Sequence, residues 1–146
     1  MSAQLNSPYG IAIDLQGNVY ISDHLNNRVR RIDGLTGRMS TVAGNGTAGF
    51  SGDDGAGTIA ALNGPTALVL DRADGLYISD TNNNRIRKLD LLSGMITTVA
   101  GGGNTGLGDE GPATSAQLYT PHGIALDESG NLYIADSGSH RIRKVE

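Results

Sequence analysis

The sequence repeats itself three times, and this repetition limits the possible folds more than any other feature. The segment PYGIAID at residues 8–14 returns as PTALVLD at residues 65–71 and as PHGIALD at residues 121–127, so the spacings are 57 and 56 residues. A period of this length is typical of a chain in which each repeat forms one supersecondary unit. Neighbouring units then stack to bury a shared core.

Each repeat contains short segments whose composition is typical of β-strands. VYISD at residues 19–23 is followed by RVR at 28–30, and both motifs return twice; a fourth segment, STVAG at 40–44, returns once at 97–101. Runs rich in Ile, Val, Leu and Tyr between Gly, Asn, Asp and Pro favour strands, and Gly and Asn favour hairpin turns. We therefore expect a four-stranded antiparallel meander in each repeat, except that the third repeat has no fourth strand.

Four sequential antiparallel strands are the unit of a β-propeller blade. The motif Asn-[Val/Leu]-Tyr-Ile-[Ser/Ala]-Asp, followed by Arg-[Val/Ile]-Arg, resembles the NHL repeat. The Val-Ala-Gly connectors resemble those of bacterial NHL-repeat proteins and of the teneurin propeller. The resemblance covers essentially the whole chain, and it implies an all-β propeller of four-stranded blades that usually closes with six blades.

Long connectors separate the three expected blades within a single domain. Each connector begins with glycines and then becomes Ala-rich, so we expect a glycine loop followed by one or two helical turns. The expected parts are blade 1 at about 8–44, a connector at 45–64, blade 2 at about 65–101, a connector at 102–120, and an incomplete blade 3 at about 121–146. Eleven strands are predicted in all.

Three blades make half of a six-bladed ring and leave an apolar face open at each end. Exposed apolar faces of that size are normally covered, and a second copy related by a two-fold axis is the simplest cover. We therefore expect a homodimer that acts as a self-assembling scaffold or protein-binding module. The alternatives are a nine-bladed trimer, a stable monomer, a fragment whose other blades belong to a longer parent chain, and an excised or engineered fragment with no evolved ligand.

Charge and composition exclude several functional classes. The formal net charge is −4 and the pI is about 5.2, which argues against a generally basic nucleic-acid binder. Nine of the eleven Lys and Arg residues lie in the predicted third strands, but no aromatic residues alternate with them, so nucleic-acid binding is not expected. The absence of Cys excludes disulfides and thiolate zinc sites. No apolar run reaches the roughly 18 residues that a bilayer needs, residues 1–7 do not resemble a signal peptide, and the compartment stays open.

An Asp ends the second strand of every repeat, and an Arg begins the third strand five residues later. These six residues are Asp23, Arg28, Asp80, Arg85, Asp136 and Arg141. Because catalysis rarely needs the same pair in every blade, we predict a structural ion pair that closes each hairpin. The Asp residues lie in different blades and are not expected to bind a metal. Residues 52–55 and 108–111 also lack the alternating ligands of a calcium loop.

The positions that differ between repeats are better candidates for a binding site. Tyr9, Thr66 and His122 each follow the Pro that starts a repeat. Because the first strand of a propeller blade lines the central channel, we expect these residues to surround one mouth of the channel. Of these three residue types, only His serves commonly as a general acid or base near neutral pH, which leaves open a hydrolase or lyase with its site around His122. The preferred interpretation is non-catalytic, with no catalytic residue, metal or cofactor.

Overall fold

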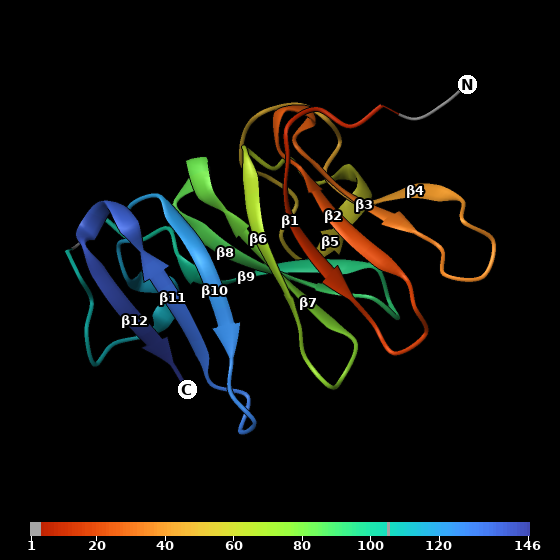
Figure 1. Ribbon diagram of the computed structural model, residues 1–146. Coiled ribbons are helices and arrows are strands. Elements are labelled where there is room, and N and C mark those ends of the chain that lie inside the picture. The colour runs from red at the N-terminus through yellow and green to blue at the C-terminus, as the bar shows by residue number, and fades with distance from the viewer. Residues whose placement is uncertain (1–3, 105) are drawn as a thin grey trace.

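The computed structural model describes residues 4–104 and 106–146, which form strands and short 3₁₀ helices (Figure 1). The strands make three antiparallel sheets. The first sheet has the order β1 (Pro8–Ile13), β2 (Val19–Asp23), β3 (Arg28–Ile32) and β4 (Met39–Ala43). The second has the order β5 (Gly55–Ala56), β9 (Met95–Gly101), β8 (Arg85–Asp90), β7 (Gly75–Asp80) and β6 (Pro65–Leu70). The third consists of β10 (Pro121–Leu126), β11 (Leu132–Asp136) and β12 (Arg141–Val145). The prediction of an all-β fold of antiparallel sheets is confirmed.

A single 3₁₀ turn joins the second and third strands of each repeat. These turns are η1 (His24–Asn26), η3 (Thr81–Asn83) and η5 (Ser137–Ser139). Each ends at a residue in the left-handed region, namely Asn27 with φ 52°, Asn84 with φ 55° and His140 with φ 56°. Asn adopts this conformation more readily than most residues, so the Asn-rich sequence favours a tight turn at the predicted place.

The connectors contain less helix than the sequence predicts, and the first one contains a short strand. Each contains one 3₁₀ turn, η2 (Gly57–Ile59) or η4 (Ala113–Ser115). The first connector also contains β5, a twelfth strand that was not predicted, because two residues are too short to carry an alternating pattern. Gly55 lies opposite Ile96 and Ala56 lies opposite Met95, so the connector leaving the first sheet pairs with the outer edge of the second.

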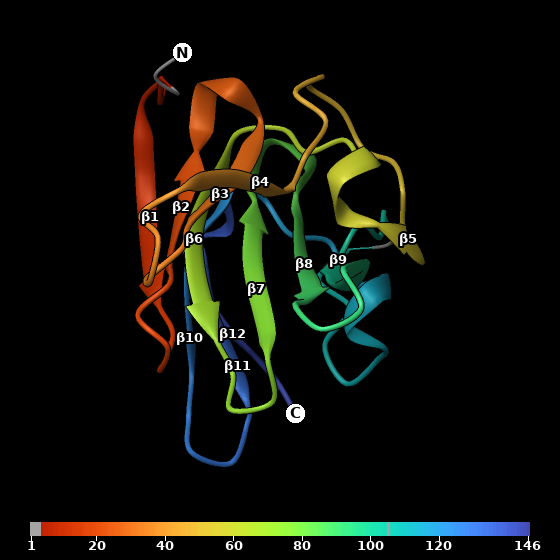
Figure 2. The ribbon, with the colours of Figure 1, turned by 90° about the vertical axis from the view of Figure 1, so that its right-hand side faces the viewer.

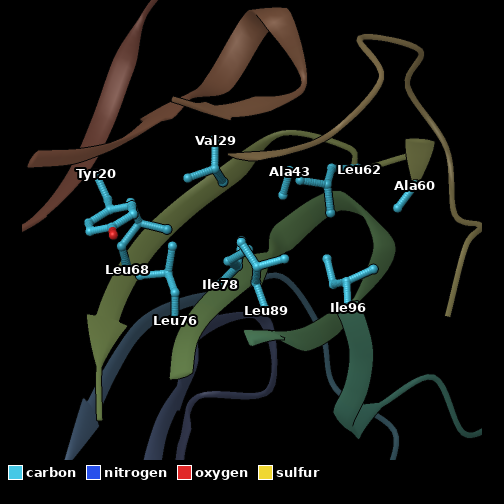
Figure 3. Packing of buried hydrophobic residues seen from close by; sticks show 10 residues of the cluster. All are labelled: Tyr20, Val29, Ala43, Ala60, Leu62, Leu68, Leu76, Ile78, Leu89 and Ile96. Atoms are coloured by element: carbon cyan, nitrogen blue, oxygen red, sulfur yellow. The ribbon is translucent and has the colours of Figure 1, made fainter. Parts of the chain in front are cut away.

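The second sheet packs between the other two. Figure 3 shows the first core, in which Tyr20, Val29 and Ala43 of the first sheet meet residues of the second sheet and of the connector. Those partners are Ala60, Leu62, Leu68, Leu76, Ile78, Leu89 and Ile96. The second core lies between the second and third sheets and contains Ile86, Ala100, Leu118, Leu132 and Ile134. Burying each large aliphatic side chain contributes roughly 1.5–3 kcal/mol, so these two cores hold the stack of sheets together.

The first strands of the three repeats lie side by side, with β6 between β1 and β10 (Figure 1). Figure 2 shows β1, β6 and β10 on one side of the molecule and β5 and β9 on the other. β1 approaches β6 so closely at Gly10 that a Cβ there would collide with the carbonyl oxygen of Thr66. The sheets therefore radiate from a shared line of inner strands.

Candidate functional site

The three predicted channel-mouth residues lie on neighbouring inner strands, but they do not share one environment. Tyr9 and His122 are exposed, whereas Thr66 is buried. The Thr66 hydroxyl donates to the carbonyl oxygen of His122 at 3.2 Å and lies 2.7 Å from Thr81 Oγ1. Thr81 in turn donates to the carbonyl oxygen of Pro121 at 2.8 Å. The Thr66 side chain thus links the second sheet to the third, and ligand binding at these residues stays a prediction.

Tyr9 packs beside a different histidine. Its ring centroid lies 5.0 Å from that of His24, and His24 Nδ1 lies 3.2 Å from the carbonyl oxygen of Pro65. Within residues 4–104 and 106–146, no three His, Asp or Glu side chains are grouped closely enough to hold a metal ion. The hypothesis of an enzyme with its site around His122 also stays a prediction.

Each Asp at the end of the second strand forms an ion pair, but not with the predicted Arg. The predicted pairs, Asp23–Arg28, Asp80–Arg85 and Asp136–Arg141, lie opposite each other in the strand register. The observed ion pairs are Asp23–Arg30 at 3.4 Å, Asp80–Arg87 at 3.4 Å and Asp136–Arg143 at 3.9 Å. Each of these Asp residues therefore does form an ion pair with an Arg. The prediction named the wrong arginine, because the partner lies two residues further along the third strand.

The physical reason lies in the direction of the long side chains. In a sheet, a residue and its diagonal neighbour two positions along the facing strand share one face. Arg30 and its equivalents use this diagonal position. Arg28 instead donates to the carbonyl oxygen of Asn45 at 3.0 Å, and the Arg85 guanidinium lies 3.7 Å from the ring centroid of Phe50. Arg28 and Arg85 thus contact the first connector, and Arg85 also donates to the carbonyl oxygen of Asn83 in the hairpin turn at 2.9 Å.

The ion pair of the second sheet belongs to a larger network. The Arg87 side chain is fully buried, and its Nη2 donates to Asp53 Oδ1 at 2.7 Å and to the carbonyl oxygen of Ser51 at 3.3 Å. Thr98 Oγ1 donates to the other oxygen, Asp53 Oδ2, at 2.7 Å. Asp53 on the connector therefore ties β8 to β9, while Arg87 Nη1 faces Asp80 on β7.

Burial raises the pKa of Asp80 to about 6. Three donors act in the opposite direction and lower it, namely Asn83 Nδ2 at 2.8 Å, the N–H of Asn63 at 2.8 Å and the Arg87 guanidinium. Removal of the carboxylate from water outweighs them. The network therefore contains a group that titrates near pH 6.

The third repeat contains the same network without its last member. Arg143 Nη2 donates to Asp109 Oδ1 and to the carbonyl oxygen of Leu107, both at 2.6 Å. Among the described residues, the third sheet has no strand beyond β12, so the position of Thr98 has no counterpart. The Asp109 side chain is 66% exposed, against 32% for Asp53.

A groove of about 600 Å³ lies beside β12. Its walls are formed by residues 142–146 of β12 and its end, and by residues 108–113 of the second connector; Ala100, Ala116, Leu118 and Ile134 also line it. Residues 108–111 in its wall repeat residues 52–55 of the first connector.

Other basic residues of the third strands are also paired with acids. The pairs are Arg31–Asp33 at 3.1 Å, Lys88–Asp71 at 2.8 Å and Lys144–Glu146 at 2.6 Å. These carboxylates offset the positive charge along the strands, in keeping with the expectation that the chain does not bind nucleic acid, which stays a prediction. Throughout the described part of the chain, the helices are too short and too polar to cross a bilayer.

Stacked antiparallel sheets with their first strands side by side define a repeat protein of the β-propeller type. The family model of the NHL repeat matches residues 62–89 and 118–145. The chain therefore contains NHL repeats, as its strand motifs predicted.

Curated relatives carry the same repeats within longer chains. The chain is 32% identical to Protein SUPPRESSOR OF QUENCHING 1, chloroplastic, of Arabidopsis thaliana, over 95% of this chain and 14% of that protein. It is 30% identical to NHL repeat-containing protein 2 of Homo sapiens, over 96% of this chain and 22% of that protein. It is 32% identical to teneurin-1 of Caenorhabditis elegans, over 99% of this chain and 5% of that protein. The chain thus spans less than a quarter of each relative.

Solved structures show the same fold. A protein of unknown function from Bacteroides thetaiotaomicron matches 99% of this chain and 36% of its own, with a TM-score of 0.81 and 28% identity. An auxiliary nutrient binding protein from Bacteroides ovatus matches 100% of this chain and 38% of its own, with a TM-score of 0.80 and 28% identity. Virginiamycin B lyase from Staphylococcus aureus matches 98% of this chain and 39% of its own, with a TM-score of 0.65 and 18% identity, and it shows the fold alone.

Proposed function

We propose that this chain is a non-catalytic scaffold and protein-binding module that forms half of a six-bladed propeller, with a second copy supplying the other half. One observation carries the proposal: positions that are buried between sheets are exposed on the two outer faces of the stack. Ile11 on the first sheet is 63% exposed, whereas Leu68 at the same repeat position is 8% exposed. Ile142 on the third sheet is 72% exposed, whereas its counterpart Ile86 is fully buried.

The two outer faces are complementary by repetition. Inside the chain, the face with Tyr20 and Val29 packs against the next sheet at Leu68. The outer face of the third sheet carries the counterparts Tyr133 and Ile142, and the outer face of the first sheet carries Ile11. The third sheet of one copy therefore offers the first sheet of another the contact that already joins neighbouring sheets. Two such contacts around a two-fold axis close the ring.

The comparisons support a binding module rather than a named activity. The relatives that share the NHL repeats are much longer than this chain, and the lyase shares only the fold. Contiguous apolar faces of this kind mark interaction sites on soluble proteins. We therefore place the primary binding surface on the outer faces of the first and third sheets.

Light scattering on a sizing column tests the proposal through the mass of the particle. The chain has a mass of 15.1 kDa, so two copies give a mass of ~30 kDa. We expect Ile142→Asp to reduce this value to that of one chain, because a carboxylate in the interface would lose its water. The matched control is Leu35→Asp, which changes an exposed leucine in the turn between β3 and β4 and should leave the mass unchanged.

Other masses overturn the proposal. A folded wild-type chain that stays at the mass of one copy over a wide range of concentrations would mean that other segments cover these faces. A mass of ~45 kDa would indicate a ring of three copies instead. An equal loss of association in both Asp variants would show that the outer face of the third sheet is not the contact.

A further inference from the structure

Two Asn-Gly dipeptides lie at opposite ends of the first connector. They are Asn45–Gly46, shortly after β4, and Asn63–Gly64, directly before β6. Asn is one of the thermolabile residues, and its side-chain amide is most open to attack by the next backbone nitrogen when that residue is Gly, because Gly has no Cβ to hinder the approach. The two dipeptides have the same chemistry but different surroundings.

The second dipeptide, Asn63–Gly64, is held by several hydrogen bonds. The N–H of Gly64 donates to Asn27 Oδ1 at 3.0 Å, so the nitrogen that would attack is already engaged. Asn63 Oδ1 accepts from Asn82 Nδ2 at 3.2 Å, and the N–H of Asn63 donates to Asp80 Oδ1 at 2.8 Å. Attack on the Asn63 side chain would require several of these bonds to break first.

The first dipeptide, Asn45–Gly46, has the opposite arrangement. Asn45 is exposed, and within the part of the chain that the structure describes, the N–H of Gly46 has no hydrogen-bond acceptor. Asn45 Oδ1 accepts a hydrogen bond from the N–H of Thr47 at 2.8 Å. This bond closes a ring that includes the Gly46 nitrogen, so it keeps the side-chain amide folded back toward the peptide bond that carries the nitrogen.

A cation lies against this same peptide bond. Arg28 Nη2 donates to the carbonyl oxygen of Asn45 at 3.0 Å, and a Cβ at Gly46 would collide with the guanidinium. Because Arg stays protonated, its charge favours the form of the peptide that has lost the Gly46 proton. Gly46 has a φ of 94°, a conformation that suits glycine, so the loop itself requires the residue that makes Asn45 reactive.

We propose that Asn45 is a site of spontaneous deamidation and that Arg28 promotes the reaction. The Gly46 nitrogen loses its proton to water and forms a bond to Asn45 Cγ, while the Cγ–Nδ2 bond breaks and Nδ2 leaves as ammonia. Water then opens the resulting succinimide at either carbonyl carbon, which gives Asp or isoaspartate. Overall, water is consumed and ammonia is released, without oxidation or reduction.

The conversion acts on the contacts that hold the two ends of the first connector together. Asn45 Nδ2 donates to the carbonyl oxygen of Ile59 at 3.2 Å, and the N–H of Asn45 donates to that of Ala60 at 2.8 Å. Deamidation removes the first of these donors, and isoaspartate adds a carbon atom to the backbone beside the second. The inference goes beyond the proposed function and does not depend on it, because neither outer face of the stack takes part.

Peptide mapping by mass spectrometry tests the inference on the folded full chain. Trypsin cuts after Arg38 and Arg72, so one peptide, residues 39–72, contains both Asn-Gly dipeptides, and fragmentation assigns the lost amide to one of them. During incubation at mildly alkaline pH, Asn45 should be converted about tenfold faster than Asn63, or more, because the hydrogen bonds around Asn63 must break first. In urea, which removes the surroundings of both dipeptides, the two rates should become similar.

Variants separate the effect of the cation from that of exposure. Arg28→Gln should slow the conversion of Asn45 about tenfold in the folded chain and leave it unchanged in urea, whereas Arg28→Lys keeps the charge and should retain most of the rate. The control is Arg141→Gln, at the equivalent position of the third repeat, which should change neither rate. Asn27→Gly, which frees the attacking nitrogen of the second dipeptide and suits the left-handed turn, should speed the conversion of Asn63.

Three results would overturn the inference. They are a conversion of Asn45 that is slower in the folded chain than in urea, equal rates at Asn45 and Asn63 in the folded chain, and a rate in Arg28→Gln that equals or exceeds that of the wild type. Circular dichroism confirms that each variant is folded, and the first two results need only the wild-type chain. The mass of the particle is measured separately, so failure of the second-copy proposal would leave these rates interpretable.

Discussion

The second and third sheets are built from nearly the same residues, but they have different surroundings. The second sheet is covered on both faces, and its β8 pairs with β9. The third sheet is covered on one face, and its β12 is an edge. Arg87 and Arg143 occupy the same repeat position and contact the same kinds of group, yet only Arg87 is fully buried.

The difference shows that neighbours decide the energetic role of a repeated residue. In the second sheet, Asp80, Arg87, Asp53 and Thr98 form a continuous hydrogen-bonded network across four segments of the chain. In the third sheet, the network ends at an exposed Asp109. The same motif thus lies within a continuous network in one place and at the exposed end of a shorter network in the other.

The largest expected effect comes from removing the two equivalent arginines. Arg87→Leu should lower the free energy of unfolding by about 4 kcal/mol, because it leaves the buried Asp80 carboxylate without its cation. Arg143→Leu should lower it less, by about 2 kcal/mol. Arg143 lies farther from its buried partner, at 3.9 Å from Asp136, and its hydrogen-bonded partner Asp109 is largely exposed. Urea unfolding followed by circular dichroism measures both. Equal losses of stability would contradict the view that Arg87 stabilises the chain more than Arg143 because it is more deeply buried.

A second pair of variants compares apolar positions. Ile86→Ala should cost about 3 kcal/mol, because it leaves a cavity in the second core. Ile142→Ala should cost less than about 0.5 kcal/mol at low protein concentration, since its side chain is largely exposed. Thermal and urea unfolding measure the two values. A loss of similar size for Ile142→Ala at every concentration would mean that residues 142 and 86 share the same environment.

The sequence predicts the sheets well because their signals are local. Each strand has its own run of β-favouring residues, and the first two repeats have Asn where the turn needs a positive φ, at Asn27 and Asn84, whereas the third has His140. β5 could not be predicted in this way. Its two residues, Gly55 and Ala56, form a strand only because β9 lies beside them.

The candidate site was predicted less well because it depends on side-chain direction and on packing between sheets. The strand register brings Asp23 opposite Arg28, as the hairpin length implies, but the side-chain contact goes diagonally to Arg30. Similarly, the position of Thr66 on an inner strand was predictable. Its burial was not, because it depends on contacts with the third sheet.

The pH dependence of stability gives a third comparison, between the wild type and Asp80→Asn. The pKa of Asp80 rises from an ordinary value of 3.8 to about 6 in the folded chain, so the folded state holds this proton more tightly. The resulting stabilisation is complete below pH 3.8 and is lost as the pH rises through 6. Relative to the Asp80→Asn variant, the free energy of unfolding of the wild type should fall by about 2–3 kcal/mol between pH 4 and pH 7.

Urea unfolding of both proteins at a series of pH values measures this difference, and the other carboxylates cancel in the subtraction. Asp136→Asn in the third sheet serves as a matched comparison at the equivalent position. Stability curves for the wild type and Asp80→Asn that remain parallel from pH 4 to pH 7 would rule out titration of Asp80 in this range.

The smallest effect is expected from making the third sheet more like the second. Asn83 Nδ2 donates to Asp80 Oδ2 at 2.8 Å, and Asn26 Nδ2 lies 2.9 Å from both carboxylate oxygens of Asp23. Ser139 occupies this position in the third repeat. Among the described residues, Asp136 Oδ2 is buried without a hydrogen-bond partner. Ser139→Asn should therefore stabilise the chain by about 1 kcal/mol, since it supplies the missing donor.

Thermal unfolding measures this gain, and Asn83→Ser provides the reverse change in the second repeat, with an expected loss of about 1 kcal/mol or more. The gain should disappear in the double variant Ser139→Asn/Asp136→Asn, because the carboxylate that accepts the new hydrogen bond is gone. A gain that survives in the double variant would instead come from the preference of Asn for the turn. It would show that the missing hydrogen bond at Asp136 Oδ2 does not destabilise the third sheet.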